Sequence, residues 1–253
     1  MAFAGVVETL SAYTAGPGGG EFSIPLPATV NAGELLVIAF NYRAGNQALV
    51  AGSAATDFGF TAIVNRTRGT RGRLYVWTKE ALGTEGGTTL NLENASSSDA
   101  HAQYVVYRIQ NWDAVHSSDA DGSSNSANPP SLTVPTGAAD HLWLAFCAAA
   151  DDGASVDTFP TDYTDGGYER RTPPVTNSSA TVGWARRNLN AASEDPGSFG
   201  LSESESWVTA TVAATPGTKG APAGTSISAN KQDLTMTPVP ATLSLSSAVR
   251  AAI

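Results

Sequence analysis

The feature that most constrains the fold is an internal repeat whose spacing is nearly constant. Three pairs of segments match at offsets of 106 or 107 residues (140 − 34, 184 − 77 and 204 − 98): Glu34–Phe40 with Asp140–Phe146, Tyr75–Trp77 with Val182–Trp184, and Ser98–Val106 with Ser204–Val212. We expect two copies of one unit, at about residues 25–112 and 131–215. A unit of this size buries little surface alone, so two halves of one sandwich are favoured over the alternative of two independent domains.

Strand signals recur along the chain, whereas no window keeps the apolar spacing of an amphipathic helix with caps at both ends. Short apolar runs are separated by turns rich in Gly, Pro and Asn. Strands are expected near Val6–Tyr13, Gly20–Ile24, Glu34–Tyr42, Thr61–Arg66, Arg73–Glu80, Thr88–Glu93, His101–Gln110, Ser131–Val134, His141–Ala148, Thr181–Arg187, Ser198–Ser202 and Trp207–Ala213. The pattern predicts an all-β protein, an antiparallel β-sandwich of jelly-roll type with internal duplication over residues 1–215.

The composition changes after Thr215. Residues 216–224 hold Pro, Gly and small side chains, which is typical of a flexible linker. Residues 225–253 alternate Leu and Met with Thr and Ser but are interrupted by prolines. We expect an extended C-terminal arm that contacts a neighbouring subunit, with a disordered tail as the alternative. The apolar side chains that would make this contact are Leu234, Met236, Val239, Leu243 and Leu245.

The composition excludes several classes of function. The 253 residues carry 14 Lys and Arg against 23 Asp and Glu, a formal charge of −9. This acidic balance argues against nucleic acid as a partner, because nucleic-acid binding needs cations that neutralise phosphates. No apolar run approaches the ~20 residues of a membrane helix, and no basic region precedes the first apolar residues, so neither a membrane nor secretion is expected. The lone Cys147 cannot form an intramolecular disulfide, and a buried, unreactive side chain is expected.

Charged residues are unevenly placed. Arg66, Arg68, Arg71 and Arg73 flank Gly69-Thr70, and a two-residue turn there would oppose Arg68 to Arg71 and Arg66 to Arg73 on one face. The stretch from Gln110 to Glu169 is acidic and lacks Lys and Arg. A solvated hairpin tip is the simplest interpretation of the arginine face; the functional alternative is a subunit contact that meets an acidic partner, and nucleic-acid contact is the least favoured because the surrounding charge is acidic.

Two candidate binding sites remain weak at this level. Asp119, Asp121 and Asn125 place oxygen ligands around a Gly, as in a calcium loop, but further ligands are missing, and a solvated turn is the alternative. Trp112 stands at a strand end before an acidic loop and is the candidate for an exposed aromatic side chain that stacks on a glycan. Trp77 and Trp184 lie on apolar strands and are expected in the core.

No catalytic, metal or cofactor site is expected. A Gly-x-Ser-x-Gly nucleophile elbow is missing. The three histidines, His101, His116 and His141, lack the spacing of zinc ligands.

A further pattern joins the paired segments Asn31–Phe40, Leu74–Ala81, Tyr104–Trp112, Ala139–Phe146 and Thr181–Arg186 with a Thr- and Pro-rich tail at Lys231–Leu243. This pattern resembles a family of β-sandwich virion proteins of tailed bacteriophages. The chain departs from the family at Asp162-Tyr163, where Gly-Trp is often found. The resemblance implies a structural role in the virion and supplies no catalytic residues.

The expected function is a non-enzymatic phage virion structural protein, exposed as a head decoration, cement or spike subunit that braces its neighbours. Its partners would be other capsid or tail proteins and further copies of itself, with a trimer as one plausible closed arrangement. The chain would be synthesised in the host cytoplasm and act on the virion surface. The alternatives are a tail-fibre or adhesin module that binds host-surface glycans, and a polysaccharide depolymerase built on a carboxylate pair.

Overall fold

The structure is a computed structural model that describes residues 2–16, 21–43, 58–68, 72–93, 100–149, 154–170 and 180–221. All regular secondary structure in these residues is β-strand, which confirms the expected antiparallel β-sandwich. The strands are β1 (Gly5–Gly16), β2 (Glu21–Pro25), β3 (Leu35–Arg43), β4 (Thr61–Arg68), β5 (Gly72–Glu80), β6 (Thr89–Glu93), β7 (Ala100–Gln110), β8 (Trp112–Ala127), β9 (Leu132–Thr133), β10 (Ala139–Ala149), β11 (Val156–Thr158), β12 (Thr164–Arg170), β13 (Thr181–Ala191), β14 (Ser193–Glu194) and β15 (Phe199–Pro216).

The two large sheets have the same strand order. One sheet runs β1-β7-β3-β5-β4, and the other runs β8-β15-β10-β13-β12, with β11 beside the start of β15. Two small sheets, β2–β6 and β9–β14, occupy matching places along the chain. Each large sheet takes all its strands from one half of the chain, so the strand order does not confirm the finer jelly-roll type.

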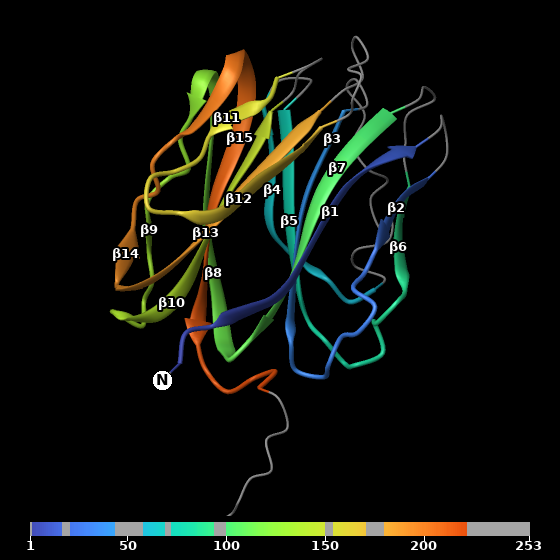
Figure 1. Cartoon of the computed structure of the whole chain (residues 1–253), viewed down its shortest axis with the longest axis vertical. Helices are drawn as coiled ribbons and strands as arrows, with labels where there is room; N and C mark the ends of the chain where they lie inside the picture. Colours follow the sequence, from blue (N-terminus) through green and yellow to red (C-terminus); the bar gives the residue numbers. More distant parts are fainter. Residues whose placement is uncertain are drawn as a thin grey trace, which may run out of the picture. The chain divides into compact units, whose positions relative to one another are not determined.

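The strands form four layers around one inner core and smaller outer cores (Figure 1). In the inner core, residues such as Val37 and Ile109 pack against Leu144 and Val212 of the second large sheet. The outer cores lie on the far faces of the large sheets, beneath β2–β6 on one side. Strands β3 and β10 are therefore buried on both faces, which explains why each reads as an unbroken apolar run.

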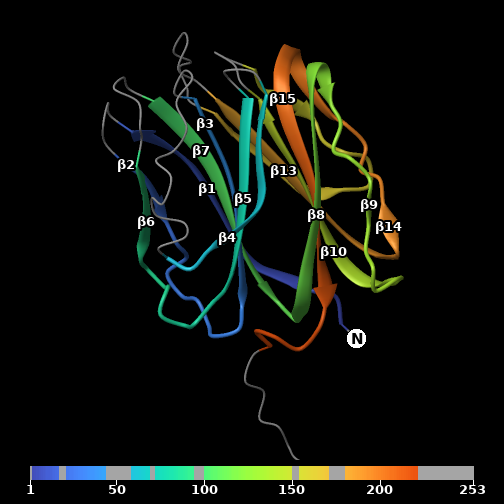
Figure 2. The same ribbon diagram turned by 180° about the vertical axis from the view of Figure 1, so that it is seen from behind.

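The two large sheets are stacked with their strand orders reversed. The last strand of each sheet therefore lies over the first strand of the other. Strand β4 contacts β8, and β1 contacts β12 (Figure 2 brings β4 and β8 to the front). These edges are polar: Ser11 Oγ donates to Glu169 Oε1 at 2.7 Å, and Ser117 Oγ donates to the Ile63 carbonyl at 3.0 Å. The two halves are thus joined by an apolar centre and polar rims.

The residue alignment behind the expected repeat is wrong by one position. Phe40 and Trp77 lie in an outer core, whereas Phe146 and Trp184 lie in the inner core. An even offset of 106 for β3 therefore pairs side chains that face opposite sides of their sheets, because successive residues of a strand alternate between faces. The two halves share one strand order, but the residues that match in the sequence alignment do not occupy equivalent positions in the structure.

Every strand expected from the sequence has an observed counterpart, and the segments near Ser198–Ser202 and Trp207–Ala213 are parts of the single strand β15. Four strands were missed: β8, β11, β12 and β14. The sequence of β8 does not indicate a strand, because it consists largely of Ser, Asp, Ala and Gly. It is an edge strand whose inward side chains meet the charged β4 rather than an apolar layer, so the period-two apolar signal is missing.

The last described residues are held against the sandwich at a point that we call the exit clamp and define as Gly33, Glu80, Trp112, Lys219 and Gly220. Trp112 and Lys219 form a backbone bridge, and Trp112 Nε1 donates to the Gly33 carbonyl at 2.8 Å. Lys219 Nζ lies 4.5 Å from the centre of the Trp112 ring and 3.2 Å from Glu80 Oε2. A Cβ on Gly220 would lie 2.7 Å from Glu34 Cα, so only glycine allows this approach. The first part of the expected linker is therefore held against the sandwich.

Candidate functional site

The arginine hairpin has a different register from the one expected. Arg68 pairs with Gly72, Arg66 with Leu74 and Thr67 with Arg73. This shift turns Arg73 to the opposite face from Arg66 and Arg68, because a slip of one residue inverts the facing of a strand. Arg73 is buried there, donates to Tyr42 Oη at 2.8 Å and lies over the Tyr42 ring. The expected single face of four arginines is thus wrong; Arg71 lies outside the described residues.

The acidic partner of Arg66 and Arg68 belongs to the same chain. Arg66 Nη1 donates to Asp119 Oδ1 at 2.7 Å, Arg66 Nε donates to Asp121 Oδ2 at 2.6 Å, and Arg68 Nη1 donates to Asp121 Oδ1. Hydrogen bonds from Arg68 and Arg66 lower the pKa of Asp121 below its usual value. These side chains join β4 to β8, so the acidic groups that Arg66 and Arg68 meet belong to their own chain. The contact between subunits stays a prediction.

The same contacts argue against the calcium site that was expected at Asp119, Asp121 and Asn125. Asp119, Asp121 and Asn125 lie along strand β8 rather than around a loop, and the two carboxylates already bind guanidinium groups. Across the described part of the chain, no three His, Cys, Asp or Glu side chains are grouped as metal ligands.

The glycan candidate Trp112 is buried, at 6% exposure, and the prediction that it is exposed is wrong. Its indole is covered by Lys219 and bonded to Gly33, so it cannot stack on a sugar. Trp77 and Trp184 are buried as expected. Cys147 is also buried, and burial raises the pKa of its thiol. The expected arm residues, Leu234, Met236, Val239, Leu243 and Leu245, lie outside the described residues.

The best candidate for a binding site is a hollow of about 600 Å³ at the edge of β13, which we call the polar hollow. Among the described residues, those that line it are polar: Asp162, Thr164, Arg186, Arg187 and Asn188. The hollow exists because β12 is shorter than its neighbour. The first residue of β12, Thr164, pairs with Arg186, whereas β13 continues to Ala191 with β10 on its other side only.

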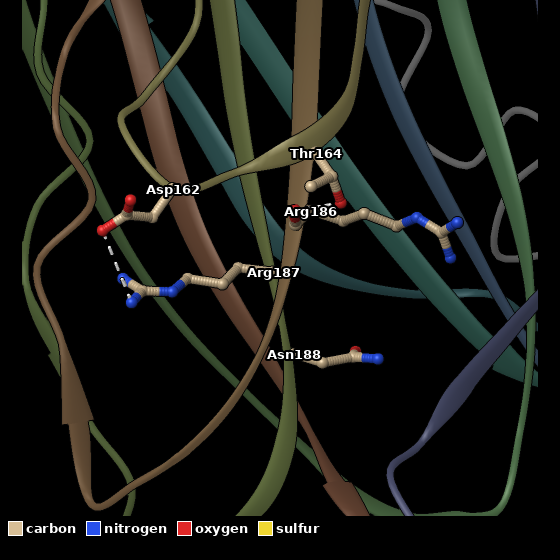
Figure 3. A pocket seen from close by; sticks show the side chains of 5 residues that line it. All are labelled: Asp162, Thr164, Arg186, Arg187 and Asn188. Carbon is tan, nitrogen blue, oxygen red and sulfur yellow. Dashed lines mark hydrogen bonds and ion pairs between the residues drawn. The ribbon is translucent and has the colours of Figure 1, made fainter.

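The lining side chains come from both faces of β13. Figure 3 shows Arg186 and Asn188 on one side of the strand and Arg187 on the other, with Asp162 reaching toward Arg187. Arg187 Nη1 lies 3.0 Å from Glu194 Oε1, and its Nη2 lies 3.7 Å from Asp162 Oδ2. Arg186 Nε donates to Asp165 Oδ2 at 2.6 Å. The two guanidinium groups are therefore held in place by three carboxylates.

Asp162 has a backbone conformation that favours glycine. Its φ is 64°, at the third position of a turn closed by a hydrogen bond of 3.2 Å from Tyr163 N to the Pro160 carbonyl. Such turns normally place Gly or Asn there. The matching turn before β4 has Gly59 at that position, with a φ of 76°. Of these two matching turns, the one beside the polar hollow therefore has a residue other than glycine at the position of positive φ.

Little in the sequence indicates this site. Strand β12 and the shortfall that exposes β13 depend on strand pairing, which a single sequence does not reveal. One signal was present: Asp162-Tyr163 departs from the Gly-Trp of the resembling family.

Comparison with known proteins finds no matching family model, no matching curated protein and no matching solved structure. In the described ranges, no helix has the length and apolar character needed to cross a membrane.

Proposed function

We propose that the chain is a non-enzymatic structural protein of a bacteriophage virion, displayed at the particle surface and joined to other virion proteins through the residues that follow Pro222. The proposal combines the resemblance of the sequence to phage β-sandwich proteins with a physical property of the fold. That property is the firm attachment of the C-terminal residues to the sandwich, which would let it resist a force applied through them.

The observation that carries the proposal is the exit clamp. Gly217 N donates to the Asn111 carbonyl at 2.8 Å, and Lys219 N donates to the Trp112 carbonyl at 3.1 Å. The clamp continues directly into β15, which is paired with β8 on one edge and with β10 and β11 on the other. A pull on the C-terminal residues would therefore load ladders of hydrogen bonds on both edges of an internal strand, which suits a chain that braces its neighbours.

A truncation tests the proposal, and the exit clamp sets where to cut. A chain that ends at Pro222 keeps Lys219 and Gly220, so it should unfold at the same temperature as the full chain. We expect this truncated chain to be missing from purified particles, as measured by quantitative mass spectrometry of virions. Full-length Lys219→Ala, which weakens the clamp but keeps residues 223–253, should still be incorporated.

Two outcomes would overturn the proposal. One is normal incorporation of the truncated chain, which would reject attachment through residues 223–253. The other is failure to find the full chain on particles by electron microscopy or mass spectrometry, which would reject the virion role itself.

A further inference from the structure

We propose that the polar hollow is a binding site for the hydroxyl groups of a neutral carbohydrate. This inference goes beyond the structural role and does not depend on it. It rests on the chemistry of the lining residues, on their charge balance, on the conformation of Asp162 and on comparison with the matching hollow in the other half of the chain.

The hollow offers fixed donors and acceptors in close succession. The Asn188 side chain is exposed and has no hydrogen-bond partner within the described residues. Thr164 Oγ1 donates to the Arg186 carbonyl at 3.4 Å, so that carbonyl faces the β12 side. Alternate residues of a strand point their backbone groups the same way, and the N–H and C=O of Asn188 therefore face the uncovered edge. A sugar hydroxyl both donates and accepts, so it can use amide, guanidinium and carboxylate groups together.

The charge balance favours a neutral ligand over an anion. Two guanidinium groups, on Arg186 and Arg187, are in ion-pair contact with the carboxylates of Asp162, Asp165 and Glu194. A phosphate or sulfate would have to compete with these carboxylates for the same cations. An extended peptide is also disfavoured, because strand addition takes its specificity from pockets for side chains, and the described residues that line this hollow are polar.

A matching hollow in the first half shows which features of the polar hollow are shared by both halves and which occur in the second half alone. It lies beside the start of β4 and the end of β5, and its lining includes Phe58, Gly59, Lys79 and Glu85. Lys79 Nζ lies 2.8 Å from the buried Glu85, just as Arg187 lies beside the buried Glu194. This ion pair is therefore part of the duplicated framework.

What distinguishes the second half is the polar character of its hollow. The first hollow presents the exposed side chains of Phe58 and Leu82, whereas the second presents Asp162 and Asn188. Asp162 also keeps a backbone conformation for which the first half uses glycine. Non-glycine residues held in such conformations cluster at functional sites.

The test uses two variants on opposite sides of β13 and one matched control. Asp162→Gly copies Gly59 and fits the positive φ, so the variant should unfold at the same or a higher temperature. Asn188→Ala removes an amide with no partner within the described residues. Thr84→Ala, in the lining of the first hollow, is the control. The probe is an array of dextran, galactan and mannan oligosaccharides, with dextran sulfate as the anionic comparison.

We expect saturable binding of at least one neutral oligosaccharide, weakened at least tenfold by Asp162→Gly and by Asn188→Ala and unchanged by Thr84→Ala. The proposal is overturned by no binding to any neutral oligosaccharide, by binding of dextran sulfate alone, or by affinity that either variant leaves intact. Incorporation into particles is a separate measurement, so failure here leaves the structural role standing.

Discussion

At the residue scale, the buried Glu85 and Glu194 show how single side chains stabilise the segments that follow β5 and β13. Glu85 is 6% exposed and accepts hydrogen bonds from Lys79 Nζ at 2.8 Å and from the backbone N–H groups of Leu82 and Thr84 at 3.0 Å each. Burial alone would raise the pKa of Glu85. The hydrogen bonds from Lys79 and the backbone outweigh burial and lower this pKa to about 2.

This shift predicts a pH dependence of stability. The pKa of Glu85 is lower in the folded chain, at about 2, than its ordinary value of 4.5, so the ionised carboxylate stabilises the fold above pH 4.5. That stabilisation is lost as the pH falls from 4.5 toward 2. We expect Glu85→Gln to lower the free energy of unfolding at pH 7, and the gap from the unsubstituted chain to narrow by about 3 kcal/mol by pH 2.

Urea denaturation at a series of pH values measures this gap. Thr84→Ala is the matched control, because it keeps the backbone N–H that binds Glu85, and it should follow the pH dependence of the unsubstituted chain. A gap that stays constant from pH 7 to pH 2 would contradict the assignment of this pH dependence to Glu85.

At the element scale, the pairing of β4 with β5 decides what the arginines do. The sequence alone correctly located both strands, because each has a clear run of apolar and β-branched residues. It could not locate the turn to one residue, and that residue decides which face Arg66 and Arg73 occupy. The acidic strand β8 was missed for a related reason: its partner groups are charges on β4, which become visible only when the sheets are packed.

The contact between β4 and β8 predicts a modest, salt-dependent stabilisation. Asp121 bridges Arg66 and Arg68, and its side chain is 20% exposed, whereas the arginine side chains are 41% and 38% exposed. We expect Asp121→Ala to lower the free energy of unfolding by about 1 kcal/mol at low salt, since partly exposed ion pairs are weak but this one joins three charges. The loss should shrink in 1 M NaCl, where screening acts within ~3 Å.

Urea denaturation at 50 mM and 1 M NaCl gives both values. Asp113→Ala, on the same strand and with an exposed side chain, is the matched control and should change stability little. An equal loss at both salt concentrations would show that Asp121 acts through packing rather than through charge.

At the scale of the whole molecule, duplication explains both the success and the error of the sequence interpretation. Two copies of one strand order produce similar apolar runs at similar spacing, and from these runs the β-sandwich could be predicted. The copies have diverged so far that a match of letters pairs Phe40 of an outer core with Phe146 of the inner core. The polar hollow arises from a difference between the copies, so no pattern shared by them could reveal it.

The shared inner core leads to a last prediction, about the two halves as separate chains. Residues 1–111 alone would expose the inner face of their large sheet, with Leu35, Val37, Val105 and Ile109. Residues 112–222 alone would expose Leu144, Phe146, Val208 and Val212. Each apolar surface would be far larger than a soluble monomer tolerates. We therefore expect neither fragment to be a folded monomer.

Circular dichroism and analytical ultracentrifugation of the two fragments test this expectation. Each fragment alone should lack a cooperative thermal transition or associate with itself, whereas the mixed fragments should form a one-to-one complex that unfolds cooperatively. A fragment that is monomeric and unfolds cooperatively would show that its outer core suffices. In that case the inner core would be an interface between two domains, and the repeat would be two domains in contact rather than one sandwich.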